Sequence, residues 1–148
     1  VLHGVSMGAA TVLMASGEDL PGNVKAVIAD CGYTSEWDEF RREADALHIP
    51  WFPVLNATSV LSKIRDGYDF KQASALAQVK KSHIPTLFIH GSSDELVPYS
   101  MLGELYAAAA CEKEELTVEG AGHALSSSVA PTLYWRTVED FIAKHLDR

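Results

Sequence analysis

Short apolar runs that alternate with helical patterns constrain the fold of this chain more than any other feature. Four runs have the length and composition of buried strands. They span residues 1–3, 24–29, 86–90 and 115–118. Helical patterns follow at residues 7–16 and 98–110, and a last one begins near residue 131. Such alternation is typical of βα units, so we predict an α/β fold, a three-layer sandwich with a mostly parallel sheet.

The stretch between the second and third predicted strands breaks this rhythm. Roughly 50 residues separate the two strands, which is too many for a plain crossover. Ser35 and Asp38 have the spacing of a capping box, and a second helical stretch spans residues 54–65. We therefore predict a small helical cap, inserted at about residues 33–83 into one domain that covers residues 1–148.

The composition limits which partners such a domain can bind. The chain has 148 residues, of which 47% are hydrophobic, and this suffices for one sizeable core. Acidic residues outnumber basic ones 20 to 12, and the net charge of −8 argues against nucleic acid as a partner. The apolar runs are shorter than the roughly 18 residues that a membrane span needs. No targeting signal is readable, so localisation stays open.

The segment from Gly4 to Gly8 has the pattern G-x-S-x-G, with Ser6 at its centre. In this pattern a serine lies on a tight strand-to-helix turn, and the flanking glycines allow neighbouring backbone to approach closely. The turn exposes the serine oxygen and directs the next backbone N–H, that of Met7, at a developing oxyanion. An apolar strand before it and a helical segment after it match this context. Ser6 is therefore the candidate nucleophile.

A serine nucleophile needs a base, and the base needs an orienting acid. His123 follows the fourth predicted strand and Asp94 follows the third. Loops at the carboxyl ends of parallel strands are where open α/β sheets place their sites. We predict a triad of Ser6, His123 and Asp94. Asp94 would also suit a turn or helix cap, and Asp30 at the end of the second strand is the rival acid.

Four segments together resemble a known family: LHGVSMG, ADCGYTS, IPTLFIHGSSDELVP and GAGHA. They are similar to the α/β-hydrolase superfamily, in particular to its bacterial YqkD-like and prolyl-oligopeptidase-like serine hydrolases. The resemblance implies Ser6 as nucleophile, His123 as base and Asp94 as acid. It also implies that the chain is the C-terminal half of the fold, strands five to eight, so that the loop carrying the second oxyanion donor lies elsewhere.

The chemistry that these residues predict is acyl transfer to water through a serine ester. We expect a small-molecule ester or related acyl substrate, and no cofactor. A peptidase of the prolyl-oligopeptidase type and a non-catalytic binding scaffold are the alternatives. We expect the fragment alone to be weakly active or inactive. Cutting the fold before its fifth strand would leave an apolar sheet edge, so we expect a homodimer or association with the missing half.

The remaining candidates have weaker support. Trp37, Trp51 and Phe52 could line a substrate pocket or could only pack the cap onto the core. We expect His3 and His90 to be structural, and the other three histidines, His48, His83 and His145, to be surface or cap residues. The histidines lack metal-ligand spacing, so we predict no metal site. Cys31 and Cys111 could be free or bridged.

Overall fold

The computed structural model describes residues 1–146, and its centre is a parallel sheet. The strands are β1 (Leu2–Val5), β2 (Val27–Asp30), β3 (Thr86–Gly91) and β4 (Lys113–Val118). They lie in the order β1-β2-β3-β4, and all three neighbouring pairs are parallel. Every strand therefore ends at the same edge of the sheet, where the predicted site residues follow.

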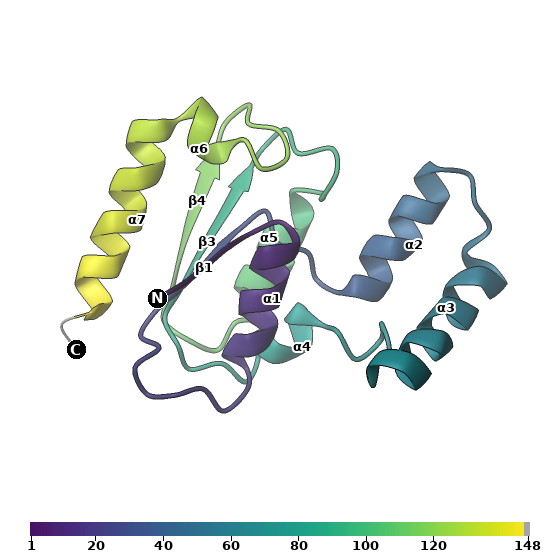
Figure 1. Ribbon diagram of the computed structural model, residues 1–148. Helices are drawn as coiled ribbons and strands as arrows, with labels where there is room; N and C mark the ends of the chain where they lie inside the picture. The colour runs from purple at the N-terminus through teal and green to yellow at the C-terminus, as the bar shows by residue number, and fades with distance from the viewer. Residues whose placement is uncertain (147–148) are drawn as a thin grey trace.

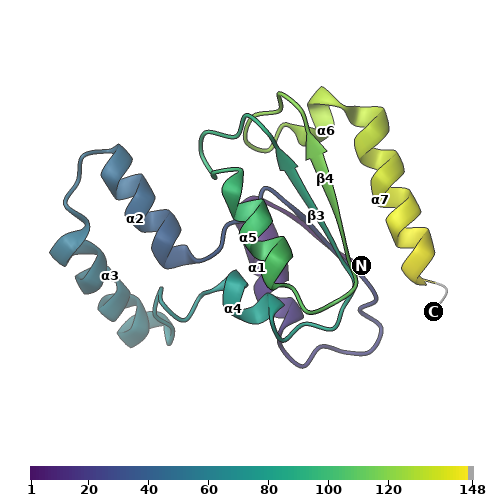
Figure 2. The ribbon, with the colours of Figure 1, turned by 180° about the vertical axis from the view of Figure 1, so that it is seen from behind.

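Helices cover both faces of this sheet and complete the predicted three layers (Figure 1). One face carries α1 (Met7–Ser16), α4 (Ala75–Val79) and α5 (Ser100–Ala108). The other carries α7 (Pro131–Leu146), which the short helix α6 (Ser126–Val129) precedes. The view from behind in Figure 2 shows the same separation of α7 from α1, α4 and α5.

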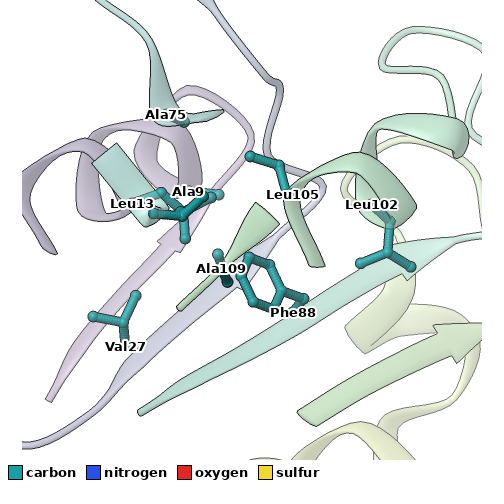
Figure 3. Packing of buried hydrophobic residues seen from close by; sticks show 10 residues of the cluster. Ala9, Leu13, Val27, Ala75, Phe88, Leu102, Leu105 and Ala109 are labelled. Atoms are coloured by element: carbon teal, nitrogen blue, oxygen red, sulfur yellow. The ribbon is translucent and has the colours of Figure 1, made fainter. Parts of the chain in front are cut away.

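The two cores follow from the period of a strand. Val27 and Ala29 face the α1 side, where Leu13 and Phe88 join them in the cluster that Figure 3 shows. Ile28, between them in sequence, belongs to the cluster on the α7 side. Because successive side chains of a strand point to opposite faces, a fully apolar strand requires a helical layer on each face. β2, which is buried throughout, has both.

The segment between β2 and β3 forms a helical hairpin, α2 (Glu36–Ala46) and α3 (Trp51–Asp66), which Figures 1 and 2 show set apart from the sheet. Half of the predicted capping box forms, because the Asp38 amide donates to Ser35 Oγ at 3.1 Å. The Asp38 carboxylate accepts from the Ser35 hydroxyl at 2.6 Å instead of from the Ser35 amide. After the hairpin the chain returns to the core through α4, whose Ala75 and Val79 are buried beside α1.

Several boundaries differ from the prediction. β2 begins at Val27 rather than residue 24, because the Val24 amide still closes a turn onto the Pro21 carbonyl. β4 begins two residues early, at Lys113. α3 has its first residue at Trp51, but Phe52 is extended (φ −99°, ψ 132°), so the continuous helix begins after it, close to the predicted residue 54. The prediction omitted α4 and α6. It also placed His145 at the surface, whereas this side chain is buried, with its ring edge-on to Phe141.

Two further expectations concern the edges of the molecule. β1 pairs only with β2 in the described sheet, and its residues His3 and Val5 are exposed. The expected pairing of this edge with another chain stays a prediction. None of the helices within residues 1–146 is long and apolar enough to cross a membrane.

Candidate active site

Ser6 lies on the sharp turn between β1 and α1. Its backbone has φ 55° and ψ −118°, a left-handed φ that is uncommon for a residue other than glycine. Two backbone hydrogen bonds hold the turn: the Ser6 amide donates to the Asp30 carbonyl at 2.8 Å, and the Ala10 amide donates to the Ser6 carbonyl at 3.1 Å. Strain of this kind persists only where the surroundings fix it, which is common at functional sites.

The two glycines of the motif have different roles. A Cβ on Gly4 would lie 2.1 Å from the Gly8 carbonyl oxygen, so only glycine lets the strand and helix meet there. A Cβ on Gly8 would have nothing within 4 Å among the described residues. The prediction of close backbone approach on both sides is therefore correct for Gly4 and wrong for Gly8.

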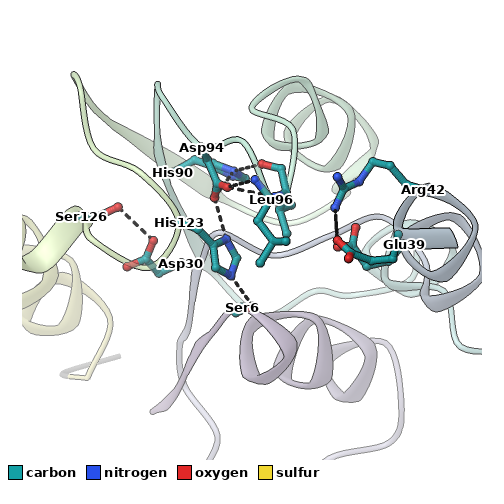
Figure 4. A network of polar contacts seen from close by, with 11 residues as sticks. Ser6, Asp30, Glu39, Arg42, His90, Asp94, Leu96, His123 and Ser126 are labelled. Carbon is teal, nitrogen blue, oxygen red and sulfur yellow. Dashed lines mark hydrogen bonds and ion pairs between the residues drawn. The ribbon is translucent and has the colours of Figure 1, made fainter. Parts of the chain in front are cut away.

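Ser6, His123 and Asp94 form one hydrogen-bonded row (Figure 4). Ser6 Oγ lies 2.8 Å from His123 Nε2, and His123 Nδ1 lies 2.9 Å from Asp94 Oδ2. A carboxylate accepts, so Nδ1 carries the proton of a neutral imidazole and Nε2 is left as the acceptor for the serine hydroxyl. The row spans the ends of β1, β3 and β4, three of the four strands.

Asp94 is held by more than His123. Its Oδ1 accepts hydrogen bonds from the amides of Leu96 at 3.0 Å and Val97 at 2.9 Å, so this oxygen caps the turn after β3. Its Oδ2 faces His123 and also lies 3.3 Å from His90 Nε2. The side chain is fully buried. One oxygen of Asp94 thus caps the turn, and the other contacts His123.

His90 has one contact that the sequence did not predict, besides its expected structural one. It was expected to be structural, and its Nε2 does lie 3.0 Å from the Val97 carbonyl. A carbonyl only accepts, so this nitrogen carries a proton, which also faces Asp94 Oδ2. The signal for this second role was its position four residues before Asp94, across the turn.

Asp30, the rival acid, lies in a separate network. It is buried, and its Oδ1 accepts a hydrogen bond from Ser126 Oγ at 3.2 Å. Burial raises the pKa of Asp30, while hydrogen bonds from Ser126 and Tyr134 oppose that rise. The Tyr134 hydroxyl lies 3.0 Å from His3 Nε2, so this network extends to β1, the outer strand of the described sheet. The carboxylate that contacts His123 belongs to Asp94.

Cys31 follows Asp30 and lies beside the row. Its thiol, a carboxylate oxygen of Asp94 and a ring nitrogen of His123 all lie within 4.8 Å of one another, a grouping that could hold a metal ion. Burial is the main reason that the pKa of Cys31 is raised to about 12, so a metal would have to displace a strongly held proton. The donors of Asp94 and His123 also face each other already. Both Cys31 and Cys111 are free.

The predicted oxyanion and pocket residues lie at different places. Met7 is the first residue of α1, where a backbone N–H has no carbonyl partner within the helix. Trp37 lies in the first turn of α2, with the Lys71 amino group 4.5 Å from its ring centre. Trp51 lines an apolar hollow between α2 and α3, together with Phe40. Phe52 is 65% exposed, and a role of the three aromatic residues in substrate binding stays a prediction.

Two solved structures with a similar fold are by their titles an esterase and a peptidase. The esterase Pf2001 of Pyrococcus furiosus superposes with a TM-score of 0.70 at 18% identity, covering 97% of this chain and 53% of the esterase. The acylaminoacyl peptidase of Pyrococcus horikoshii gives a TM-score of 0.67 at 15% identity, covering 95% of this chain and 23% of the peptidase. At such identities the likeness establishes the fold, which is that of the α/β-hydrolases.

The sequence narrows this class to a family. The chain belongs to the prolyl oligopeptidase family, which it matches over residues 1–148. It is 33% identical to the protein YqkD of Bacillus subtilis over 144 residues, which cover 95% of this chain and 47% of YqkD. The chain thus spans about half the length of this relative.

Proposed function

We propose that the protein is a serine hydrolase that cleaves carboxylic esters through a Ser6–His123–Asp94 triad. One observation carries the proposal: the Ser6 Oγ–His123 Nε2 separation of 2.8 Å continues into the His123 Nδ1–Asp94 Oδ2 separation of 2.9 Å. The three residues come from distant loops, and the spacing is that of a nucleophile, a base and an orienting acid. The strained turn at Ser6 adds a second, independent sign of function.

The first half of the reaction forms a covalent ester. Ser6 Oγ attacks the carbonyl carbon while His123 Nε2 takes its proton, and the carbonyl electron pair moves onto oxygen. The Met7 N–H stabilises that oxyanion. Asp94 keeps Nδ1 protonated and stabilises the imidazolium that forms. When the tetrahedral intermediate collapses, the bond to the leaving group breaks and His123 gives it the proton.

The second half releases the acid. Water attacks the serine ester while His123 Nε2 takes its proton. When the second tetrahedral intermediate collapses, the bond between the acyl carbon and Ser6 Oγ breaks, His123 returns the proton to Ser6 Oγ, and the carboxylic acid leaves. Proton transfer of this kind contributes about 10²–10⁴-fold to the rate. All steps use side chains and one backbone amide of this chain, and the second oxyanion donor is assigned to the remainder of the fold.

Labelling with a fluorophosphonate tests this proposal. We expect the full-length protein to gain one adduct by intact mass, and peptide mapping to locate it on Ser6. Ser6→Ala should abolish the adduct and lower turnover of a p-nitrophenyl ester by about 10⁶. An unlabelled but folded protein, or a variant with near-normal turnover, would contradict the hydrolase proposal and favour a binding scaffold.

Peptide cleavage is the second candidate, because a structural neighbour is by its title an acylaminoacyl peptidase. Both reactions use the same triad and differ in the leaving group, an alcohol or an amine. Parallel assays with an ester and an anilide of the same acyl group separate them. We expect the ester to be the better substrate, and a higher kcat/KM for the anilide would reverse the assignment.

A further inference from the structure

A hollow of about 440 Å³ opens beside the candidate nucleophile. It runs along α1 from Met7 to Met14, and residues near the hairpin, Tyr33, Glu36 and Tyr68 among them, form the opposite wall. A helix rises about 1.5 Å per residue, so the seven steps from Met7 to Met14 give the hollow a length of about 10 Å. A small acyl chain fits this length.

The position of the hollow indicates which part of a substrate would enter it. Met7, whose amide is the proposed oxyanion donor, lines the hollow, whereas His123 does not belong to its lining. A leaving group departs next to His123, which protonates it. The hollow therefore lies on the acyl side of the scissile bond, and this assignment rests on the proposed function.

The wall of the hollow carries a negative charge without a counterion. Among the described residues, no cation pairs with the Glu36 carboxylate. Of the two arginines on its helix, Arg42 binds Glu39 and Glu43, and Arg41 lies over the Trp51 ring. Burial raises the pKa of Glu36, and in the described part of the chain no hydrogen bond or positive charge counteracts this rise. A cation in the hollow would supply what this carboxylate lacks.

Two tyrosines flank this carboxylate. Tyr33 is only 7% exposed, yet its hydroxyl has no hydrogen-bond partner among residues 1–146. Tyr33, Glu36 and Tyr68 line the same hollow. Burial is the main reason that the pKa of Tyr33 is raised to about 12, and the carboxylates of Glu36 and Glu39 add to this rise. Tyrosine rings attract cations at their faces, and the hydroxyls accept hydrogen bonds from an ammonium group.

The backbone holds this wall in place. The Glu36 amide donates to the Ala73 carbonyl at 2.9 Å, and the Leu76 amide donates to the Thr34 carbonyl at 2.9 Å. These two bonds tie the start of α2 to the returning chain at the start of α4. A binding wall fixed in this way requires little ordering when a ligand enters.

We propose that this hollow is an acyl subsite for substrates that carry an ammonium group, recognised by Glu36 together with Tyr33 and Tyr68. The thioethers of Met7 and Met14 line the hollow and would contact the aliphatic part of the substrate's acyl chain. The protein would then prefer esters of amino acids with the amine distant from the carbonyl over esters of simple fatty acids of equal length.

Two isosteric esters test the subsite in the full-length protein. The p-nitrophenyl ester of ε-aminocaproic acid ends in an ammonium group where p-nitrophenyl heptanoate ends in a methyl group. We expect kcat/KM to favour the amino ester, and Glu36→Gln to reduce this preference by about tenfold or more, as for a hydrogen bond to a charged group. Glu43→Gln removes the same charge from the same helix outside the hollow and should keep the preference.

The outcomes separate the subsite from the triad. If both esters are hydrolysed but Glu36→Gln leaves their ratio unchanged, the subsite is wrong and the hydrolase stands. If neither ester is hydrolysed and Ser6 takes no fluorophosphonate, the proposed function fails and the subsite falls with it. Equal labelling rates of Ser6 in the wild type and in Glu36→Gln verify that the variant is folded.

Discussion

The carboxyl edge of the sheet and the helical hairpin differ in which side chains they bury. At the carboxyl edge, polar side chains are buried and paired: the Asp94 side chain is fully buried and accepts several hydrogen bonds. In the hairpin, apolar side chains face outward: Ile64 is 79% exposed and Leu61 60%. The first arrangement holds polar atoms through several hydrogen bonds, whereas the second leaves apolar surface available for contact. The proposed triad thus belongs to the hydrogen-bonded region, and the exposed apolar surface belongs to the hairpin.

The two buried aspartates offer the largest test of this assignment. Asp94→Asn leaves the shape of the side chain but lets the amide donate to His123, which favours the wrong tautomer, and we expect turnover to fall by about 10⁴. Asp30→Asn should change turnover by less than about tenfold, because Asp30 bonds Ser126 and not His123. Steady-state ester hydrolysis by the two full-length variants measures both.

A larger loss in Asp30→Asn than in Asp94→Asn would transfer the role of the acid to Asp30. The unfolding temperatures of both variants control for stability, since both side chains are buried.

Gly4 and Gly8, which flank the turn at Ser6, test how rigid the carboxyl edge of the sheet is. Gly4→Ala sets a Cβ 2.1 Å from the Gly8 carbonyl oxygen, and we expect a loss of about 3 kcal/mol or more in the free energy of unfolding. Gly8→Ala meets open space and removes a helical glycine, so we expect a gain of up to about 1 kcal/mol. Urea unfolding of the full-length variants gives both values. Similar losses at the two positions would mean that the close approach of Gly4 to the Gly8 carbonyl does not decide the stability of this turn.

Sequence reasoning predicted the elements whose signal is local. Helix α1 was predicted with both of its bounds, and β3 to within one residue. β4 was predicted two residues too short because its first positions, Lys113 and Glu114, are polar and half-buried at the sheet edge, so an apolar run does not mark them. Helix α6 has the sequence SSSV, which carries no helical pattern.

The proximity of the candidate site residues was predictable from chain order and strand ends. Ser6, Asp94 and His123 each follow a strand, and parallel strands end together, so their approach followed from topology. The hollow lined by Tyr33, Glu36 and Tyr68 was not predictable, because its walls depend on how the hairpin returns to the core. That return is set by tertiary packing, which has no periodic signature in the sequence.

Leu13 and Ile64 have apolar side chains of equal size, one in the core and one on the hairpin. Their different burial predicts different contributions to the free energy of unfolding. Leu13→Ala removes a fully buried side chain between α1 and the sheet, and we expect it to cost about 2–5 kcal/mol. Ile64→Ala on α3 should change stability by less than about 0.5 kcal/mol, because 79% of this side chain is exposed. Denaturant unfolding measures both. A large cost at Ile64 would show that the outward face of the hairpin is covered in the full-length protein.

Two serine caps with the same hydrogen bond give the finest comparison. Ser35 Oγ accepts from the Asp38 amide at the start of α2, and Ser74 Oγ accepts from the Ala77 amide at the start of α4, both at 3.1 Å. Loss of such a cap costs about 1 kcal/mol. α4 packs into the core, so we expect Ser74→Ala to lower the global free energy of unfolding by this amount.

Ser35→Ala should act locally instead, because all residues of α2 are exposed or half-buried. Hydrogen exchange distinguishes the two results: the amides of α2 should exchange faster in Ser35→Ala while those of β2 and β3 keep their protection. If Ser35→Ala lowers the protection of β2 and β3 as much as Ser74→Ala does, the hairpin unfolds together with the core. The wall that carries Glu36 would then share the rigidity of the sheet edge.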